Sequence, residues 1–411
     1  MIKPKIRFKG YQEEWEQRKL GDLVDRVTRK NQDLVSELPL TISAQYGLID
    51  QNEFFDKRVA SKDVSGYYLI ENGEFAYNKS TSTDAPWGAI KRLDRYENGV
   101  LSTLYIVFGI KENNPVYSDF LVSYYSTNLW HKGIHEIAAE GARNHGLLNI
   151  APADFFETKL KIPQDIEEQK KIGKYFEELE RLITLHHRKC EETKILKKYM
   201  LQKMFPQNGN SVPEIRFWGF TEDWEQRKLI DVCDYVDYRG KTPIKTDSGV
   251  FLVTAKNVKD GYIDYGASQE YISEDDYEEV MHRGKPEIGD VLITTEAPCG
   301  NVAQVNRADI ALAQRIIKYR GQSNIVDNTY LKYYLLSPEF QNILNAKSSG
   351  GTVKGIKGSI LHQQEIKYPK YEEQFKIGSY FNNLDHLITL HQKKCDELQN
   401  IKKFMLQNMF I

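Results

Sequence analysis

The chain has 411 residues, more than the ~100–200 of a typical domain, so its length predicts at least two separate cores. It contains no run of ~18 apolar residues and no apolar signal segment near its N-terminus, which predicts a cytoplasmic protein without a membrane span. The net charge of −2 excludes a globally basic nucleic-acid binder, so any contact with DNA must come from local basic surfaces.

The chain repeats itself. Residues 7–25, RFKGYQEEWEQRKLGDLVD, return at 216–234 as RFWGFTEDWEQRKLIDVCD. A longer pair aligns 167–205 with 372–410, where 24 of 39 positions are identical by direct count. Shared helical composition would not give this identity, so we infer an internal duplication.

Between the repeated segments lie two variable stretches, roughly 26–162 and 235–368, whose sequences have diverged almost completely. They keep a common order of predicted elements: a short strand before a polar tip, a strand ending in polar residues, an A-P-x-G turn, an alternating strand, a helical stretch, a Gly-rich segment and a last strand. In the first and second stretch respectively, the short strand with its polar tip is 39–47 and 250–258, the next strand is 73–83 and 289–298, and the A-P-x-G turn is 85–88 and 297–300. The alternating strand is 102–110 and 313–321, the helical stretch 118–134 and 328–344, and the Gly-rich segment 140–150 and 348–361. The last strands precede Pro163 and Pro369.

Beyond these prolines each copy predicts one long helix of about 39 residues, roughly 58 Å at ~1.5 Å per residue. Apolar or small residues recur at 4,3 spacing, which is typical of a coiled-coil seam. The seam consists of Ile172, Phe176, Leu179, Ile183, His186 and Cys190, with Ile377, Phe381, Leu384, Ile388, His391 and Cys395 in the second copy. The duplication favours an antiparallel pair that acts as a rigid ruler, with one domain near each end.

The predicted fold is therefore two mixed α+β domains joined by long helices that pair as an antiparallel coiled coil. We expect a first variable domain at 1–165, a long helix at 166–206, a second variable domain at 207–370 and a second long helix at 371–411.

This order of variable domain, repeated helix, variable domain and repeated helix resembles the specificity subunit of type I restriction-modification systems over nearly the whole chain. The repeated WEQRKL, the segment GDVLITTEAPCGNVAQV, the Ile-Pro before EEQKKIG and the LITLH helices carry the resemblance. It implies that each variable domain is a target-recognition domain reading one half of an interrupted double-stranded DNA sequence, with the helices setting the gap.

The resemblance also implies that the chain is not an enzyme. It would recruit two methyltransferase subunits and two ATP-driven translocase-nuclease subunits, and S-adenosylmethionine, ATP and Mg would bind to those partners. The residues agree, because Asn114-Pro115-Val116-Tyr117 lacks the second proline of an amino-methyltransferase motif. No P-loop and no H-E-x-x-H string occurs either.

The four cysteines, Cys190, Cys233, Cys299 and Cys395, show no C-x-x-C spacing and are expected to be reduced thiols. His186 with Cys190, and His391 with Cys395, lie four residues apart near the middle of each long helix. Two readings are open: a tetrahedral zinc site where the helices meet, or ordinary packing residues copied by the duplication. We predict packing, since the seam already explains the spacing.

Reading bases requires side chains that hydrogen-bond to base edges, so polar loop tips are the candidate positions. In the first domain they are Ser43, Gln45, Tyr46, Asn78, Lys79, Ser80, Thr81, Arg143, Asn144 and His145. In the second they are Thr254, Lys256, Asn257, Thr294, Thr295, Glu296, Gln314, Arg315, Thr352, Lys354 and Lys357. The neighbouring Gly350, Gly351, Gly355 and Gly358 would let backbone N–H groups approach phosphates closely.

Aromatic residues outside these loops are expected to pack in the cores. Helical spacing favours packing over base stacking for Tyr124, Tyr125, Tyr333 and Tyr334. Trp15 and Trp224 recur in the repeated segments, and shared residues cannot specify different half-sites. The near-neutral charge leaves a second hypothesis, a pseudo-dimeric protein-interaction scaffold without sequence-specific DNA binding.

Overall fold

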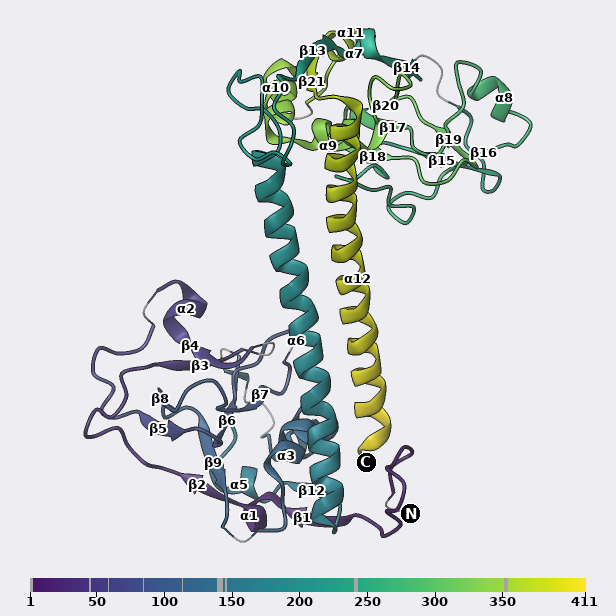
Figure 1. The fold of residues 1–411 in the computed structure, drawn as a ribbon. Coiled ribbons are helices and arrows are strands. Elements are labelled where there is room, and N and C mark those ends of the chain that lie inside the picture. Colours follow the sequence, from purple (N-terminus) through teal and green to yellow (C-terminus); the bar gives the residue numbers. More distant parts are fainter. Residues whose placement is uncertain are drawn as a thin grey trace. The chain divides into compact units, whose positions relative to one another are not determined.

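The computed structural model describes residues 3–43, 46–57, 59–83, 85–112, 114–138, 143–144, 146–239, 243–350 and 354–411, with the backbone alone at 143–144. The chain forms two compact units: unit 1 contains Met1–His186 and Lys394–Ile411, and unit 2 contains His187–Lys393. Each unit therefore combines one variable domain with the first part of the long helix that follows it and the last part of the other long helix (Figure 1).

Unit 1 is built around a four-stranded antiparallel sheet of order β2-β9-β6-β7, and β1 pairs with β12 beside it. Three smaller pairs, β3-β4, β5-β8 and β10-β11, complete the domain. The elements are β1 (Glu16–Lys19), α1 (Leu20–Leu23), β2 (Val24–Val27), β3 (Leu40–Ser43), β4 (Gly47–Asp50), α2 (Gln51–Phe55), β5 (Tyr68–Glu71), β6 (Phe75–Asn78), β7 (Ala89–Arg92), β8 (Asn98–Leu101), β9 (Ile106–Ile110), α3 (Ser118–Tyr125), α4 (Leu129–Ile137), β10 (Arg143–Asn144), β11 (Leu147–Leu148), α5 (Pro152–Phe156) and β12 (Lys159–Ile162).

Unit 2 repeats the central sheet as β14-β20-β17-β18, and β13 pairs with β21 as β1 does with β12. Its smaller sheet, β16-β15-β19, differs from that of unit 1 and contains a parallel pair, β15 with β19. The elements are β13 (Glu225–Lys228), α7 (Leu229–Val232), β14 (Cys233–Asp237), β15 (Val250–Val253), β16 (Tyr271–Ile272), α8 (Tyr277–Val280), β17 (Val291–Thr295), β18 (Cys299–Gln304), β19 (Ile310–Leu312), β20 (Ile316–Gly321), α9 (Asn328–Leu336), α10 (Pro338–Lys347), α11 (Gly358–His362) and β21 (Glu365–Tyr368).

Both central sheets separate two hydrophobic cores. In β17, Val291 and Ile293 face the core that holds α9, whereas Leu292 between them belongs to the smaller core on the other face. In β6, Phe75 and Tyr77 face one core and Ala76 the other. Because successive strand residues point to opposite faces, a strand covered on both sides is apolar throughout rather than alternating.

The aromatic residues predicted to pack do so. Trp15 and Trp224 are buried, as are the paired tyrosines of α3 and α9. The packing interpretation of Tyr124, Tyr125, Tyr333 and Tyr334 is therefore confirmed, and these rings do not offer a stacking platform to a base.

The two long helices are α6 (Ile166–Lys203) and α12 (Tyr371–Met409). Within unit 1 they pair antiparallel, since Cys395 lies against Ile183 and Lys402, further along α12, binds the earlier Glu180. Within unit 2 the same direction holds, with Cys190 against Ile388 and Lys197 bonded to Asp385. The predicted fold of mixed α/β domains with paired long helices is confirmed. No helix among the described residues is long and apolar enough to cross a membrane.

The repeated E-E-Q that opens each long helix locks it to its own variable domain. Glu168 is fully buried and accepts two hydrogen bonds from Arg7, at 2.6 and 2.7 Å, and Glu373 accepts two from Arg216, at 2.7 and 2.8 Å. A bidentate Arg-carboxylate pair fixes orientation as well as distance, which explains why both partners belong to the repeated segments.

The next residue of each long helix, Gln169 or Gln374, holds the variable domain through hydrogen bonds from its side chain to main-chain atoms of that domain. The Gln169 amide donates to the carbonyls of Pro115 and Pro163 and accepts from the N–H of Tyr117. In unit 2 the Gln374 amide does the same with Ile325, Pro369 and Asp327. This Gln clamp therefore recognises main-chain atoms and places no demand on the side chains of the domain it holds.

Each core is completed by a phenylalanine from the far end of the other long helix. Phe410 contacts Trp15, Phe120 and Phe176 in unit 1, with ring centroids 5.5 to 6.1 Å apart. Phe205 fills the same place in unit 2, against Trp224 and Phe381. The repeated M-F ending of the duplication, at 204–205 and 409–410, thus belongs to the core of the opposite repeat.

Candidate nucleic-acid interface

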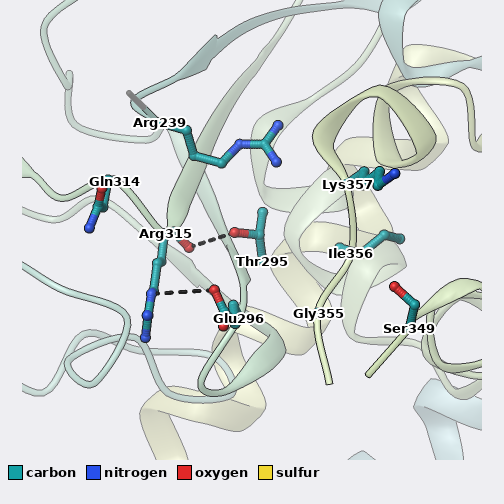
Figure 2. A pocket seen from close by; sticks show the side chains of 9 residues that line it. All are labelled: Arg239, Thr295, Glu296, Gln314, Arg315, Ser349, Gly355, Ile356 and Lys357. Atoms are coloured by element: carbon teal, nitrogen blue, oxygen red, sulfur yellow. Dashed lines mark hydrogen bonds and ion pairs between the residues drawn. The ribbon is translucent and has the colours of Figure 1, made fainter. Parts of the chain in front are cut away.

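An open cleft of about 430 Å³ in unit 2 collects polar residues from four separate segments (Figure 2). Thr295 and Glu296 end β17, Gln314 and Arg315 precede β20, and Arg239 follows β14. The rest of the lining is Ser349, Gly355, Ile356 and Lys357, from the Gly-rich segment before α11. The cleft therefore lies at one edge of the central sheet, where strands end and loops begin.

Backbone hydrogen bonds hold the segments of the cleft in place. The Thr295 N–H donates to the Arg315 carbonyl, and the Ile356 N–H donates to the Thr295 carbonyl, each at 2.9 Å. Gly355 and Ser349 exchange two further 2.9 Å bonds. The polar side chains of the cleft are thus carried on a floor of paired main chain, to which the Thr295 hydroxyl adds one bond to the Arg315 carbonyl.

The charged side chains of the cleft are mostly cationic. Arg315 lies 3.4 Å from Glu296, and both side chains are about half exposed, so solvent screens this ion pair. Lys357 is exposed at the start of α11. With Arg239, the cleft presents three cations against the single carboxylate of Glu296, together with the Gln314 amide. Such a surface suits a polyanion that also offers hydrogen-bonding edges.

Arg239, which sequence reasoning missed, is held at the rim by Asp237. Its guanidinium donates to both carboxylate oxygens, at 2.9 Å from Nε, and this bond raises the pKa of Arg239. Burial raises the pKa of Asp237, but the bonds from Arg239 outweigh it and the net pKa is lowered. Both groups are therefore charged at neutral pH. The sequence signal was a basic residue directly after a strand, in the segment Y-R-G-K at 238–241.

Gly358 has a different role from the predicted one. A Cβ on Gly358 would lie 2.3 Å from the Arg239 guanidinium and 2.7 Å from the Asp237 carboxylate, so glycine leaves room for this ion pair. Gly350 adopts a left-handed φ of +121°, which a side chain would strain. Gly351 lies outside the described residues.

Several predicted DNA contacts in the second domain are buried instead. Asn257 is fully buried, and its amide donates to Asp264 and Ser268 while accepting twice from Thr254. Its hydrogen-bonding capacity is used within the loop, so the prediction that Asn257 faces bases is wrong for this conformation, whereas Thr254 is half-buried. Thr294 and Thr295 are also buried, and their hydroxyls bond to backbone within the sheet.

The remaining predicted residues of the second domain divide into two groups. Glu296, Gln314, Arg315 and Lys357 line the cleft together, although they are far apart in the sequence. Lys256 and Lys354 are exposed but do not line it. Thr352 lies outside the described residues.

In unit 1 the structure brings two predicted segments together. The Thr81 N–H and hydroxyl both donate to the Gly146 carbonyl, at 2.7 and 3.0 Å, and the Leu148 N–H donates to the Lys79 carbonyl. Arg143 and Asn144 lie on β10, which pairs with β11 in the same place. The loop at 78–81 and the Gly-rich segment are therefore neighbours, as the cleft segments are in unit 2.

The side chains of these unit 1 candidates differ in availability. Ser80 and Tyr46 are exposed, and Asn78 accepts a bond from the Ser80 N–H within its own turn. Lys79 donates to the Ile150 carbonyl at 3.4 Å, and burial lowers its pKa. Ser43 is buried, so the prediction that it faces DNA is wrong for this conformation. Gln45 and His145 lie outside the described residues.

Close packing explains the glycine at the end of each A-P-x-G turn next to these loops. A Cβ on Gly88 would lie 2.1 Å from the Asn78 carbonyl oxygen, and one on Gly300 would lie 2.5 Å from Leu344. Both glycines also have φ near +80 to +90°, at 77° and 92°. This turn therefore sets the strand end that carries the neighbouring polar loop in each domain.

The other motifs of the sequence have structural roles in the described parts of the chain. The Cys190 and Cys395 thiols are buried and donate weakly to the carbonyls of Ile388 and Ile183, as packing residues of the helix seam do. Among the described residues no group of three or more His, Cys, Asp or Glu is arranged to hold a metal ion. The Asn114 amide donates to the Leu23 carbonyl, which fixes a loop.

Comparisons with known proteins agree with this architecture. Residues 221–400 match the family model described as the type I restriction modification DNA specificity domain. The MjaVIII specificity subunit of a type I restriction enzyme, from Methanocaldococcus jannaschii, is 23% identical over 407 residues, covering 95% of this chain and 91% of its own. The MjaIX specificity subunit from the same organism is 30% identical over 196 residues, 46% of this chain and 44% of its own.

Among solved structures, the S subunit of a type I restriction-modification system from M. genitalium superposes with a TM-score of 0.61. The alignment covers 100% of this chain and 99% of that one, at 14% sequence identity. At this identity the likeness supports the fold alone.

Proposed function

We propose, from the premise that this chain belongs to the specificity subunits of type I restriction-modification systems, that its two variable domains read DNA independently on one constant frame. The observation that carries this proposal is the contrast within each unit. The Arg-Glu pair, the Gln clamp and the terminal phenylalanine are the same in both, whereas the loops at the sheet edge differ completely. Each domain would read one half of a bipartite target.

In unit 2 the reading residues would be those of the cleft. Arg315 can place two parallel N–H groups on the O6 and N7 acceptors of guanine, Gln314 can pair with adenine, and Glu296 can accept from the cytosine amino group. The loose pairing of Arg315 with Glu296 keeps the guanidinium oriented in the free chain and costs little to break on binding. Arg239 and Lys357 would position the cleft on phosphates.

The chain would direct catalysis that takes place on other subunits. We propose two methyltransferase subunits and two translocase-nuclease subunits as partners, which would carry S-adenosylmethionine, ATP and Mg. Support for twofold recruitment comes from exposed apolar residues that the duplication repeats away from the seam: Leu196 and Tyr199 on α6, at 43% and 49% exposure, correspond to Ile401 and Phe404 on α12, at 43% and 55%. Equivalent apolar patches suit two copies of one partner.

Exchange of one domain tests the proposal. Residues 235–368 are replaced by the corresponding stretch of another specificity subunit, and the modified genome is mapped by methylation sequencing. We expect one half of the recognised sequence to change and the other half to stay. If both halves change, or neither does, the domains do not read independently.

The scaffold hypothesis predicts a different response to salt. Phosphate contacts make the logarithm of DNA affinity fall linearly with the logarithm of salt concentration. A flat response of the assembled complex would favour a scaffold that binds proteins only.

A further inference from the structure

Unit 2 contains a second cavity, of about 550 Å³, where α9 meets both long helices. Three of its lysines come from α6, namely Lys194, Lys197 and Lys198, and a fourth, Lys332, comes from α9. The carboxylates in its wall are Asp260 and Asp385. The cavity is thus lined by four ammonium groups and two carboxylates, at a position remote in sequence from the loops of the cleft.

Lys332 is the unusual member of this group. It is 4% exposed, yet its ammonium forms no hydrogen bond or ion pair with any residue in the described part of the chain. Its only close partner there is the ring of Tyr333, with Nζ 4.1 Å from the centroid. An ammonium carries three donors, and in the lining of this cavity none of those of Lys332 has an acceptor among the described residues. Burial accordingly lowers the pKa of Lys332 to about 8.

The nearest carboxylate is already in use. Asp385 accepts a 2.5 Å bond from Lys197 through one oxygen and a 2.7 Å bond from the Tyr333 hydroxyl through the other. Lys194 is paired with Glu191, outside the cavity lining, and Lys198 is exposed on the same side of α6. The cavity therefore holds an excess of positive charge around an ammonium that lacks an acceptor among the described residues.

Unit 1 shows that the repeated long helices do not require this excess of positive charge. The ion pair between Lys402 and Glu180 repeats that between Lys197 and Asp385, since the two helices align with an offset of 205 residues. Tyr117 and Asp327 are equivalent positions, because their N–H groups donate to the equivalent glutamines of the two Gln clamps. Counting five residues onward from each, into α3 and α9, places Val122 of unit 1 where unit 2 has Lys332. Lys332 is thus a feature of the second variable domain alone.

We propose that this cavity binds a phosphate group, with Lys332, Lys197 and Lys198 as its donors. A phosphate oxygen would supply the acceptor that Lys332 lacks, and the anion would balance the surplus charge of the lining. The same group could be presented by free phosphate, by a nucleotide or by the backbone of DNA. The inference goes beyond base reading and does not depend on it.

The test is calorimetric titration of the full chain with inorganic phosphate, with chloride keeping the ionic strength constant. We expect one saturable site in the native chain and at least a tenfold weaker affinity in Lys332→Met, which keeps an unbranched side chain one atom shorter but removes the charge. Lys198→Met, on an exposed residue that cannot disturb folding, should weaken binding several-fold. Lys91→Met is the matched control, because Lys91 is a lysine of unit 1 whose pKa is also lowered by burial, and it lies near Lys402 and Glu180.

The pH dependence adds a second readout. Lys332 binds the anion in its protonated form, so affinity should fall as the pH rises through about 8, and this step should vanish in Lys332→Met. The proposal is overturned if the native chain shows no saturable phosphate binding, or if Lys332→Met binds phosphate as the native chain does.

Competition then identifies the source of the phosphate. Displacement of inorganic phosphate by a DNA duplex, at concentrations far below those of free phosphate, assigns the site to the DNA backbone. Displacement by a nucleotide alone assigns it to a free ligand. Base discrimination by the cleft would survive the loss of this site, so the two proposals can fail separately.

Discussion

The two units differ in what their variable domains present and agree in how those domains are held. Unit 2 has the cationic cleft around Arg315 and the cavity around Lys332, and the helix alignment places Val122 of unit 1 where unit 2 has Lys332. Both units share the buried Arg-Glu pair and the Gln clamp. Because the clamp binds carbonyl and N–H groups, the frame can keep its grip while side chains in the domain change.

The largest test of this comparison removes the terminal phenylalanines. Phe410→Ala should destabilise unit 1 and Phe205→Ala should destabilise unit 2, each by about 3–5 kcal/mol, since a buried aromatic ring is lost and a cavity is left. Hydrogen exchange followed by mass spectrometry locates the effect. Faster exchange of 187–393 in Phe410→Ala, with 3–186 unchanged, would contradict the assignment of that residue to unit 1.

Breaking the buried ion pair is the next largest change. Glu168→Gln and Glu373→Gln should each cost about 2–3 kcal/mol, because the arginine is left mostly buried without its countercharge. The two losses should agree within experimental error if the frame is truly duplicated. Urea unfolding with a local probe in each unit measures them, and a much smaller effect in one unit would show that its lock is not equivalent.

The reading proposal makes an asymmetric prediction. Arg315→Ala should relax specificity at one position of one half-site, by roughly 10–100-fold in discrimination, corresponding to about 1–3 kcal/mol for a bidentate base contact. Lys354→Ala, on an exposed residue outside the cleft, is the control and should leave discrimination intact. A library of duplexes varied at every position tests both variants. Uniform weakening by Arg315→Ala would make that residue a phosphate contact.

The smallest effect concerns the ion pair between the helices. Lys402→Met should change stability by less than about 1 kcal/mol, because its partner Glu180 is half exposed. Lys197→Met should cost more, since Asp385 is 28% exposed and also accepts the Tyr333 hydroxyl. Equal losses of stability in Lys402→Met and Lys197→Met, measured by thermal unfolding, would mean that the bond between Tyr333 and Asp385 adds nothing to the ion pair of unit 2.

The sequence predicted the frame better than the candidate site. The duplication located both long helices and marked Trp15 and Trp224 as shared packing residues, because repeated residues report constraints common to both halves. The sequence could not show that Asn257 and Gln314 have different roles. Both are polar residues on loops, and only the fold turns one inward to bond Asp264 and Ser268 while the other lines the cleft. Arg239 was missed because its importance arises from Asp237 and Gly358, which the sequence does not bring together.

Each unit receives its terminal phenylalanine from the end of the other long helix, and this decides the order in which the two units can complete their cores during synthesis. Every residue of unit 2 has been made once the ribosome passes residue 393, whereas unit 1, which begins at the first residue, still lacks Phe410. Unit 1 therefore starts first and finishes last, and its aromatic core stays open around Trp15 until Phe410 has been made.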